Sequence, residues 1–233
     1  MEQILKSGFE SLGIAAPADA VKQFRTYYDR LSEVGAVMNL TAIEGEEPVA
    51  RLHFLDSAAL LDCADFSGGR VVDVGTGAGF PGLPMAILKR DAQFTLLDSQ
   101  QKRMDFLDET VGLLGLGNVS VACMRAEEAP KEWRESFDIA VSRAVARLNV
   151  LCELCLPFVK KGGLFLAMKA GDCAAEVAEA AGAVRTLGGA EPEIRTYEIP
   201  GTDVVRAAVV IKKVAETPAK YPRRWARISK QPL

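Results

Sequence analysis

A glycine-rich loop that follows an apolar stretch is the part of the sequence best suited to chemistry. Residues 70–82 read Arg-Val-Val-Asp-Val-Gly-Thr-Gly-Ala-Gly-Phe-Pro-Gly. The valines predict a short buried parallel strand, and Gly75, Gly77 and Gly79 allow a tight turn that a ligand can approach without meeting a Cβ atom. Pro81 suits the first turn of a helix. A strand, a glycine loop and a helix start together predict a site for a nucleotide-like ligand.

Asp73 indicates which nucleotide-like ligand this site binds, and a second acidic residue, Asp98, supports a nucleoside site in general. Residues 77–82 match Gly-x-Gly-x-x-Gly, so a dinucleotide site is formally possible. Asp73, two residues before the first glycine, makes the loop resemble the first motif of S-adenosylmethionine-dependent methyltransferases of the Rossmann-like class. Asp98 ends the next predicted strand, nineteen residues after Gly79. A carboxylate there accepts hydrogen bonds from the ribose hydroxyls of an adenosine, and it serves either cofactor.

Strands and helices alternate around this loop, which predicts an α/β fold. Together with the methyltransferase-like motif, the pattern predicts a Rossmann-like class I methyltransferase fold with a mostly parallel seven-stranded sheet, an antiparallel edge strand and an N-terminal helical extension. The expected strands are 70–74, 93–98, 118–123, 137–142, 163–169, 191–199 and 204–213. The expected helices are 2–12, 17–36, 46–62, 82–90, 99–115, 148–160 and 171–187, with Ser99 as an N-cap. The expected parts are the helical extension 1–66, a methyltransferase domain 67–214 and a basic tail 215–233.

Composition narrows the class of protein. A hydrophobic share of 49% suits a globular core. No apolar run reaches about 18 residues and the first residues lack a signal-peptide core, so we expect no membrane partner. Five scattered cysteines predict reduced thiols and a cytoplasmic protein. His53 is the only histidine, which excludes a His-rich metal centre, and no metal is expected. Without coiled-coil heptads, we expect a monomer.

Charge is distributed unevenly along the chain. The net charge is −3, yet residues 212–233 carry seven basic residues against Glu216 alone. An acidic body with a basic tail is suited to binding phosphates locally, whereas a merely solvated tail is the alternative interpretation. The tail also hints at disorder.

Several short motifs in a fixed order identify a family. They are Asn39-Leu40-Thr41, Arg51-x-His53-x-Leu55-Asp56-Ser57, the glycine loop, Leu96-Leu97-Asp98-Ser99-x-x-Lys102-Arg103, Ser142-Arg143-Ala144-x-Ala146, Lys169 and Tyr221-Pro222-Arg223-Arg224. In this order, residues 20–233 resemble the RsmG (GidB) family, the guanine-N7 methyltransferases of bacterial small-subunit ribosomal RNA. The tail departs from the family at Trp225, where a Gly-x-Pro stretch is usual. The resemblance implies S-adenosylmethionine as cofactor and 16S ribosomal RNA or the small ribosomal subunit as partner.

The motifs and the resemblance together assign site residues. The cofactor residues are Gly75, Thr76, Gly77, Gly79, Phe80, Asp98, Ala126, Glu127 and Arg143. Arg143 is also the candidate catalytic residue, because a guanidinium at the end of the fourth strand can reach the cofactor carboxylate, a phosphate or guanine O6. The RNA-binding residues are Arg51, His53, Lys102, Arg103, Lys169, Lys220, Arg223 and Arg224.

Several of these residues have structural alternatives. Glu127 could be part of a helix N-terminal acid pair, and Arg143 could form a local salt bridge. His53 could pair with Asp56, and Lys169 could be only a charge at a strand end.

The reaction can also be considered from the residues present. Guanine N7 is a neutral acceptor with a free lone pair, so methyl transfer to it needs positioning and desolvation rather than a base. The sequence shows no evident general base, no Asn/Asp-Pro-Pro-Tyr segment and no Pro-Cys nucleophile. These absences suit a ring-nitrogen acceptor. A small-molecule methyltransferase is the alternative function, and a dinucleotide oxidoreductase would need a substrate domain or a catalytic His or Tyr-Lys arrangement.

Overall fold

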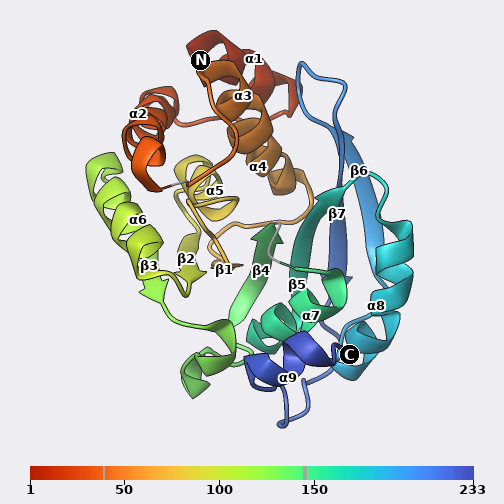
Figure 1. Cartoon of the computed structure of the whole chain (residues 1–233). Coiled ribbons are helices and arrows are strands. Elements are labelled where there is room, and N and C mark those ends of the chain that lie inside the picture. Colours follow the sequence, from red (N-terminus) through yellow and green to blue (C-terminus); the bar gives the residue numbers. More distant parts are fainter. Residues whose placement is uncertain (39, 144–145) are drawn as a thin grey trace.

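A seven-stranded β-sheet lies at the centre of the computed structural model, which describes residues 1–38, 40–143 and 146–233 (Figure 1). The strand order is β3-β2-β1-β4-β5-β7-β6. β1 to β5 run parallel, and β7 pairs antiparallel with both β5 and the edge strand β6. This confirms the predicted, mostly parallel sheet with antiparallel pairing at one edge. The strands are β1 (Arg70–Val74), β2 (Gln93–Asp98), β3 (Val119–Cys123), β4 (Phe137–Arg143), β5 (Val159–Ala170), β6 (Glu193–Glu198) and β7 (Val205–Lys212).

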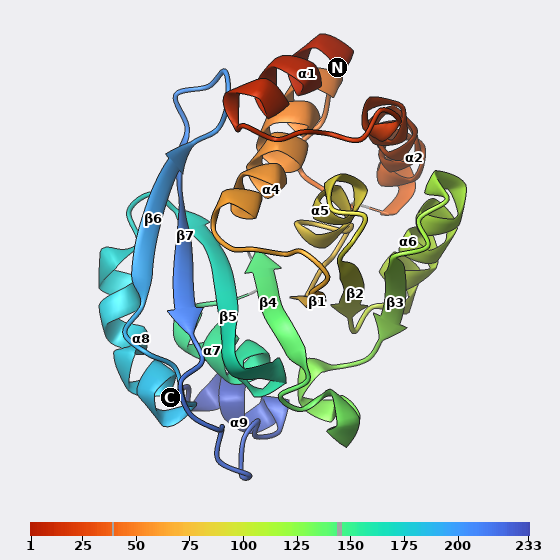
Figure 2. The same cartoon turned by 180° about the vertical axis from the view of Figure 1, so that it is seen from behind.

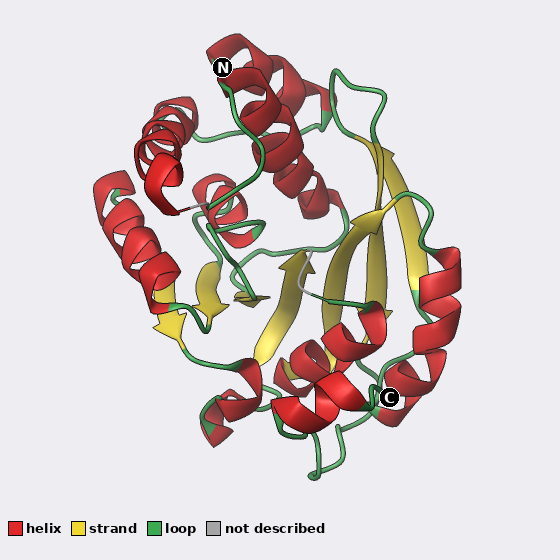
Figure 3. Cartoon of the chain, viewed as in Figure 1, coloured by secondary structure: helices red, strands yellow, loops and turns green. Residues whose placement is uncertain are grey.

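Helices surround the sheet (Figure 3). A continuous helical stretch between Glu46 and Asp62 contains a π-helical segment, η1, in its middle. No helix in the described ranges is long and apolar enough to cross a membrane. The α-helices are α1 (Glu2–Ser11), α2 (Ala20–Met38), α3 (Glu46–Val49), α4 (Asp56–Ala59), α5 (Gly82–Leu88), α6 (Gln101–Leu114), α7 (Leu148–Cys155), α8 (Ala174–Thr186) and α9 (Trp225–Lys230). The shorter turns are η1 (Ala50–Leu55), η2 (Leu60–Asp62), η3 (Ala126–Glu128), η4 (Lys131–Trp133) and η5 (Leu156–Phe158).

The two faces of the sheet bury two separate hydrophobic clusters. Successive side chains of a strand point to opposite faces, so Val71 joins one cluster while Val72 and Val74 join the other. Helices α1 to α6 cover the first face and α7 to α9 the second (Figure 2). The sequence of β1 is therefore apolar on both sides, as expected for a central parallel strand.

Two predicted helix ends were wrong. Ser99 is not an N-cap: α6 begins at Gln101 after Gln100, whose backbone N–H donates to the Asp98 carboxylate over 3.0 Å. The expected helix 148–160 stops earlier, because α7 ends at Cys155 and η5, which contains Pro157, leads into β5. Proline lacks the N–H that another helical turn would need.

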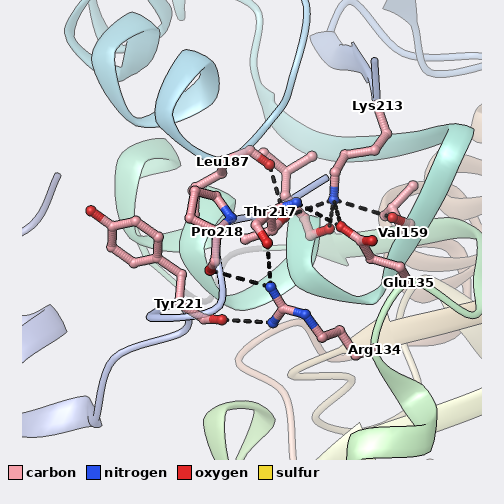
Figure 4. A network of polar contacts seen from close by, with 9 residues as sticks. Arg134, Glu135, Val159, Leu187, Lys213, Thr217, Pro218 and Tyr221 are labelled. Atoms are coloured by element: carbon pink, nitrogen blue, oxygen red, sulfur yellow. Dashed lines mark hydrogen bonds and ion pairs between the residues drawn. The ribbon is translucent and has the colours of Figure 1, made fainter. Parts of the chain in front are cut away.

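The C-terminal tail is packed, in contrast to the disorder expected from its charge. Tyr221 and Ile228 are buried in the second cluster. Figure 4 shows Arg134 donating hydrogen bonds to the backbone carbonyls of the tail, among them Pro218 at 3.2 Å and Tyr221 at 2.7 Å. The fully buried Lys213 donates to the Glu135 carboxylate at 3.0 Å. These contacts fix the start of the tail against the segment between η4 and β4.

A buried ion pair fixes the tail to α7. The guanidinium of Arg223 donates to both carboxylate oxygens of Glu153, with Nε–Oε1 at 2.8 Å and Nη2–Oε2 at 2.5 Å. Glu153 is fully buried, and its Oε1 also accepts the backbone N–H of Arg223 at 2.8 Å. The pair therefore gives Glu153 its compensating charge inside the second cluster.

Removing the arginine side chain should destabilise the whole fold. Breaking a buried pair by deleting one partner costs roughly 3–5 kcal/mol. We expect Arg223→Ala to lower the free energy of unfolding by an amount near the bottom of that range, because the backbone N–H still reaches Glu153. Urea denaturation measures this, with the exposed neighbour Arg224→Ala as matched control. Equal stability of the two variants would contradict a structural role for the pair.

For the same reason, we expect deletion of residues 218–233 to destabilise the protein.

Candidate functional site

A cavity of about 460 Å³ opens at the carboxyl ends of the parallel strands. This edge is where open α/β sheets bind ligands. Segments after β1, β2, β3 and β4 meet there with parts of both terminal regions. Of the predicted cofactor residues, the cavity is lined by Gly75, Thr76, Gly77, Phe80, Asp98, Ala126, Glu127 and Arg143.

Asp73 holds the glycine loop in shape from below. It is fully buried, and its Oδ2 accepts hydrogen bonds from Thr76 Oγ1 at 2.6 Å and from the Gly82 backbone N–H at 2.8 Å. Burial raises the pKa of Asp73 to about 6. Gly75 and Gly77 have φ values of 72° and 60°, which favour glycine. Asp73 is not among the cavity-lining residues, so its motif position reflects support of the loop.

Gly79 has a packing role in the structure, and its predicted cofactor contact stays a prediction. It does not line the cavity. A Cβ atom at this position would lie 2.5 Å from the hydroxyl of Tyr27 and 2.9 Å from Leu107 Cδ2, and the φ of 108° already strains any other residue. Gly79 therefore allows α2 and α6 to approach the loop closely.

Asp98 lines the cavity and can accept further hydrogen bonds. Its Oδ2 accepts the Gly77 backbone N–H at 3.1 Å, and Arg103 Nη1 lies 3.7 Å from the same oxygen. Its Oδ1 accepts the Gln100 N–H. Because a carboxylate offers about four lone-pair positions, Asp98 can still accept hydrogen bonds from a bound diol.

Glu127 carries an unsatisfied oxygen at the cavity. Its side chain is 6% exposed, and Oε1 has no hydrogen-bond partner within the described ranges. The nearest cation is Arg125 Nη1, 4.0 Å away. A buried acceptor without a donor is costly, and the hydroxyls or amine of an adenosine are donors of the required kind. The residues present therefore fit S-adenosylmethionine.

Arg143 connects three groups on the other side of the cavity. Its Nη2 donates to His53 Nδ1 at 3.0 Å, and its Nη1 lies 3.5 Å from the Asp56 carboxylate. Its Cζ lies 4.7 Å from the ring centre of Phe80, a cation–π contact. Arg143 therefore forms the local salt bridge that was one interpretation of it, with Asp56, and it also lines the cavity.

His53 is a neutral part of this cluster. Its ring stacks on Phe80 with centroids 4.3 Å apart. Because Nδ1 accepts from Arg143, Nε2 carries the proton and donates to Thr41 Oγ1 at 2.6 Å. Burial and the charge of Arg143 lower the pKa of His53 to about 3. The expected pairing of His53 with Asp56 was wrong, since Arg143 contacts both.

Of the predicted RNA-binding residues, His53 already has both ring nitrogens bonded, and the structure separates the seven charged ones into two groups. Arg103 lines the cavity, Lys102 is exposed beside it in the sequence at the start of α6, and Lys220 and Arg224 are exposed on the tail. The other charged groups are already engaged. Arg51 donates to Glu47 and to the Pro200 carbonyl, Lys169 donates to Glu176 and to the Ala146 carbonyl, and Arg223 pairs with Glu153.

Sequence reasoning missed part of the cavity wall. Met124, Arg125, Leu154 and Trp225 line it although none was assigned to the cofactor. The Leu40–Thr41 part of one motif also lines it, while Asn39 and Ala144 lie outside the described residues. The position of Met124 and Arg125 directly after the third strand was a usable signal. Leu154 and Trp225 carry no comparable signal, because their contacts are long-range.

The sheet order, the loop braced by Asp73 and the acid ending β2 define a class I S-adenosylmethionine-dependent methyltransferase. Two solved structures share this fold. A SAM-dependent O-methyltransferase from Thermotoga maritima is 16% identical with a TM-score of 0.56, covering 82% of this chain and 72% of that one. TYW2 from M. jannaschii in complex with AdoMet is 15% identical with a TM-score of 0.56, covering 74% and 80%.

Sequence comparison gives the family. The family model described as rRNA small subunit methyltransferase G matches residues 20–201. Proteins named ribosomal RNA small subunit methyltransferase G are similar over nearly their full length. The one from Lachnoclostridium phytofermentans is 46% identical, covering 97% of this chain and 95% of the relative, and the one from Clostridium perfringens strain 13 is 42% identical, covering 99% and 98%. The chain therefore belongs to the rRNA small subunit methyltransferase G family, and the expected resemblance is confirmed.

The neutral state of His53 can be tested directly. It is the only histidine, so its ring proton signals in ¹H NMR are unambiguous. With a folded pKa of about 3, these signals should not shift between pH 5 and 8. A titration near pH 6.5 would contradict the described cluster.

The same shift affects stability. Unfolded histidine has a pKa near 6.5, so between about pH 6.5 and 3 only the unfolded chain binds this proton, and stability falls as pH decreases. The raised pKa of Asp73 acts in the opposite direction. Comparing wild type with His53→Gln isolates the contribution of His53, because Asp73 is present in both proteins. Between pH 7 and pH 5, the free energy of unfolding of wild type should fall by up to about 2 kcal/mol relative to that of the variant.

Proposed function

We propose that this chain transfers the methyl group of S-adenosylmethionine to N7 of a guanine in 16S ribosomal RNA. Membership of the rRNA small subunit methyltransferase G family supports the reaction class and the kind of RNA. The observation that carries the proposal is that one and the same cavity brings the glycine loop, Asp98 and Glu127 together with Arg143. The five cysteines are free, which is typical of a cytoplasmic protein. A cytoplasmic location would give the enzyme access to ribosomal RNA.

The cofactor would be held on the glycine-loop side of the cavity. Asp98 offers its remaining lone pairs to the ribose hydroxyls, and Glu127 offers the oxygen that has no hydrogen-bond partner within the described ranges. Gly75 and Gly77 let the backbone approach the ligand closely. When bound, S-adenosylmethionine supplies an electrophilic methyl group on a sulfonium.

Arg143 is the group best placed to orient the acceptor or the cofactor. Asp56 and His53 hold its guanidinium, and Phe80 packs against it, so its orientation is fixed before any ligand arrives. Its free N–H directions suit either guanine O6 or the carboxylate of the cofactor. Either contact would raise the rate through positioning.

The surroundings of His53 support an acceptor that needs no deprotonation. One ring nitrogen accepts from Arg143 and the other bonds to Thr41. Neither nitrogen is available to take a proton from a substrate. Guanine N7 carries a lone pair without a proton, so it can attack directly. An exocyclic amine would have to lose a proton, which makes it less suited to this cavity.

The small-molecule methyltransferase remains the alternative class, and the family match does not favour it. A methyltransferase of that kind would share the cofactor side of the cavity. It would not need the exposed charges Lys102, Lys220 and Arg224. We propose these residues, with Arg103, as the RNA contacts, and residues 1–66 and 215–233 as segments flanking a methyltransferase domain of residues 67–214.

The acceptor atom can be tested with a modified RNA. We expect substrate RNA with 7-deazaguanine at the target position to accept no methyl group, because the attacking nitrogen is replaced by carbon. Unmodified RNA should yield a product that is cleaved after reduction and aniline treatment. Radiolabelled methyl transfer to both RNAs measures this. Transfer to the deaza substrate would mean that another atom is methylated.

The role of the exposed tail charges can be tested without disturbing the fold. A plot of log affinity against log salt concentration has a negative slope, and each lost phosphate contact makes that slope shallower by about one unit. We expect the triple variant Lys220→Gln, Arg224→Gln, Lys230→Gln to bind small-subunit RNA more weakly and with a shallower slope. The control is Lys6→Gln with Lys22→Gln, exposed on α1 and α2 at the opposite end of the molecule (Figure 1). Equal slopes for wild type and the tail variant would show a merely solvated tail.

A further inference from the structure

The C-terminal tail brings an aromatic side chain to the cavity wall. Trp225 is the first residue of α9 and lines the cavity together with Ala126 of η3 and Leu154 of α7. It is 38% exposed, although most large apolar side chains of this protein are buried. A half-open indole at a ligand cavity leaves surface that a flat ligand can cover.

Trp225 is fixed in place by contacts on both sides along the chain. Two residues earlier, Arg223 forms the buried ion pair with Glu153. Three residues later, Ile228 is fully buried in the second cluster. Upstream, the carbonyl of Tyr221 accepts from Arg134, which Figure 4 shows. The backbone that carries the indole is therefore held in place before a ligand binds, which reduces the entropy lost on binding.

The position of Trp225 suits the base end of a cofactor bound as proposed above. With the ribose at Asp98 and the reactive end over the glycine loop toward Arg143, the base extends toward the segment after β3, the strand next to β2. That segment contains Ala126, and α7 packs against both η3 and α9. Trp225 and Ala126 therefore both line the cavity beside α7.

We propose that the indole of Trp225 stacks on the adenine ring of bound S-adenosylmethionine, which makes the C-terminal tail part of the cofactor site. This inference rests on the proposed assignment of the cavity. Arg223 and Arg134 act as positioning residues for the indole, since neither lines the cavity. Stacking of a base on an aromatic side chain is sequence-tolerant and needs only two exposed flat faces.

Fluorescence reports the contact in the otherwise intact protein. The chain has two tryptophans, and Trp133 packs edge-on against Phe137 and Phe158. Trp133→Phe leaves Trp225 as the only indole. We expect S-adenosylhomocysteine and adenosine to quench its emission, and homocysteine to leave it unchanged. Quenching by homocysteine alone, or by none of the three at saturation, would overturn the proposal.

Binding of S-adenosylhomocysteine without RNA measures the energetic effect. Trp225→Ala should raise the dissociation constant at least about fivefold. Trp225→Phe should keep it within about twofold of the wild-type value, because a phenyl ring also stacks. The control is Ser229→Ala, exposed on the same helix. Thermal melts check that each variant is folded, and calorimetric titration gives the constants.

Asp98→Ala separates failure of this inference from failure of the site assignment. If Asp98→Ala loses affinity and Trp225→Ala does not, the cavity binds the cofactor but the indole does not touch it. If Trp225→Ala loses affinity for RNA only, the indole faces the RNA and the proposal is wrong. If neither variant changes cofactor affinity, the cavity assignment itself is wrong and the stacking proposal falls with it.

Discussion

The two hydrogen bonds that Asp73 accepts from Thr76 and Gly82 shape the loop on which the cavity depends. They join the start and the end of the glycine loop beneath its surface. The loop so held directs the Gly77 N–H to Asp98, which in turn caps the segment leading into α6. Both bonds go to Oδ2, while the buried Oδ1 of Asp73 has no hydrogen-bond partner within the described ranges. A buried carboxylate is costly, and these two bonds offset part of that cost while they hold the loop. The ligand surface is a consequence of this local network.

Much of the fold could be predicted from the sequence because its signals are local. The apolar residues of β1 and the acids at Asp73 and Asp98 lie within short stretches whose pattern fixes strand, turn and helix. The aromatic side chains Phe24 and Tyr27 recur at helical spacing, and both are fully buried in the core. Helix ends were less predictable. Ser99 was expected to be the N-cap of α6, but Gln100 occupies that position, and its backbone N–H donates to Asp98.

The cavity was predicted only in part, for a physical reason. Residue type shows that Arg223 is charged, but not that Glu153, 70 residues away in the sequence, already binds it. Similarly, the spacing of Gly79 suggests ligand contact, whereas the tyrosine hydroxyl from α2 explains the glycine. Contacts between distant segments decide such roles, and no local pattern encodes them.

The cavity wall combines segments from both ends of the described chain, with Thr41 before the sheet and Trp225 after its last strand. Contacts between such distant segments require long loops to close, which costs more chain entropy than closing the short loops between β1, β2 and the glycine loop. A partly folded chain that has formed β1, β2 and the glycine loop still lacks two sides of the cavity. A ligand that fills the cavity consequently binds the complete fold in preference to partly folded forms, and it shifts the balance of folding toward completion by mass action.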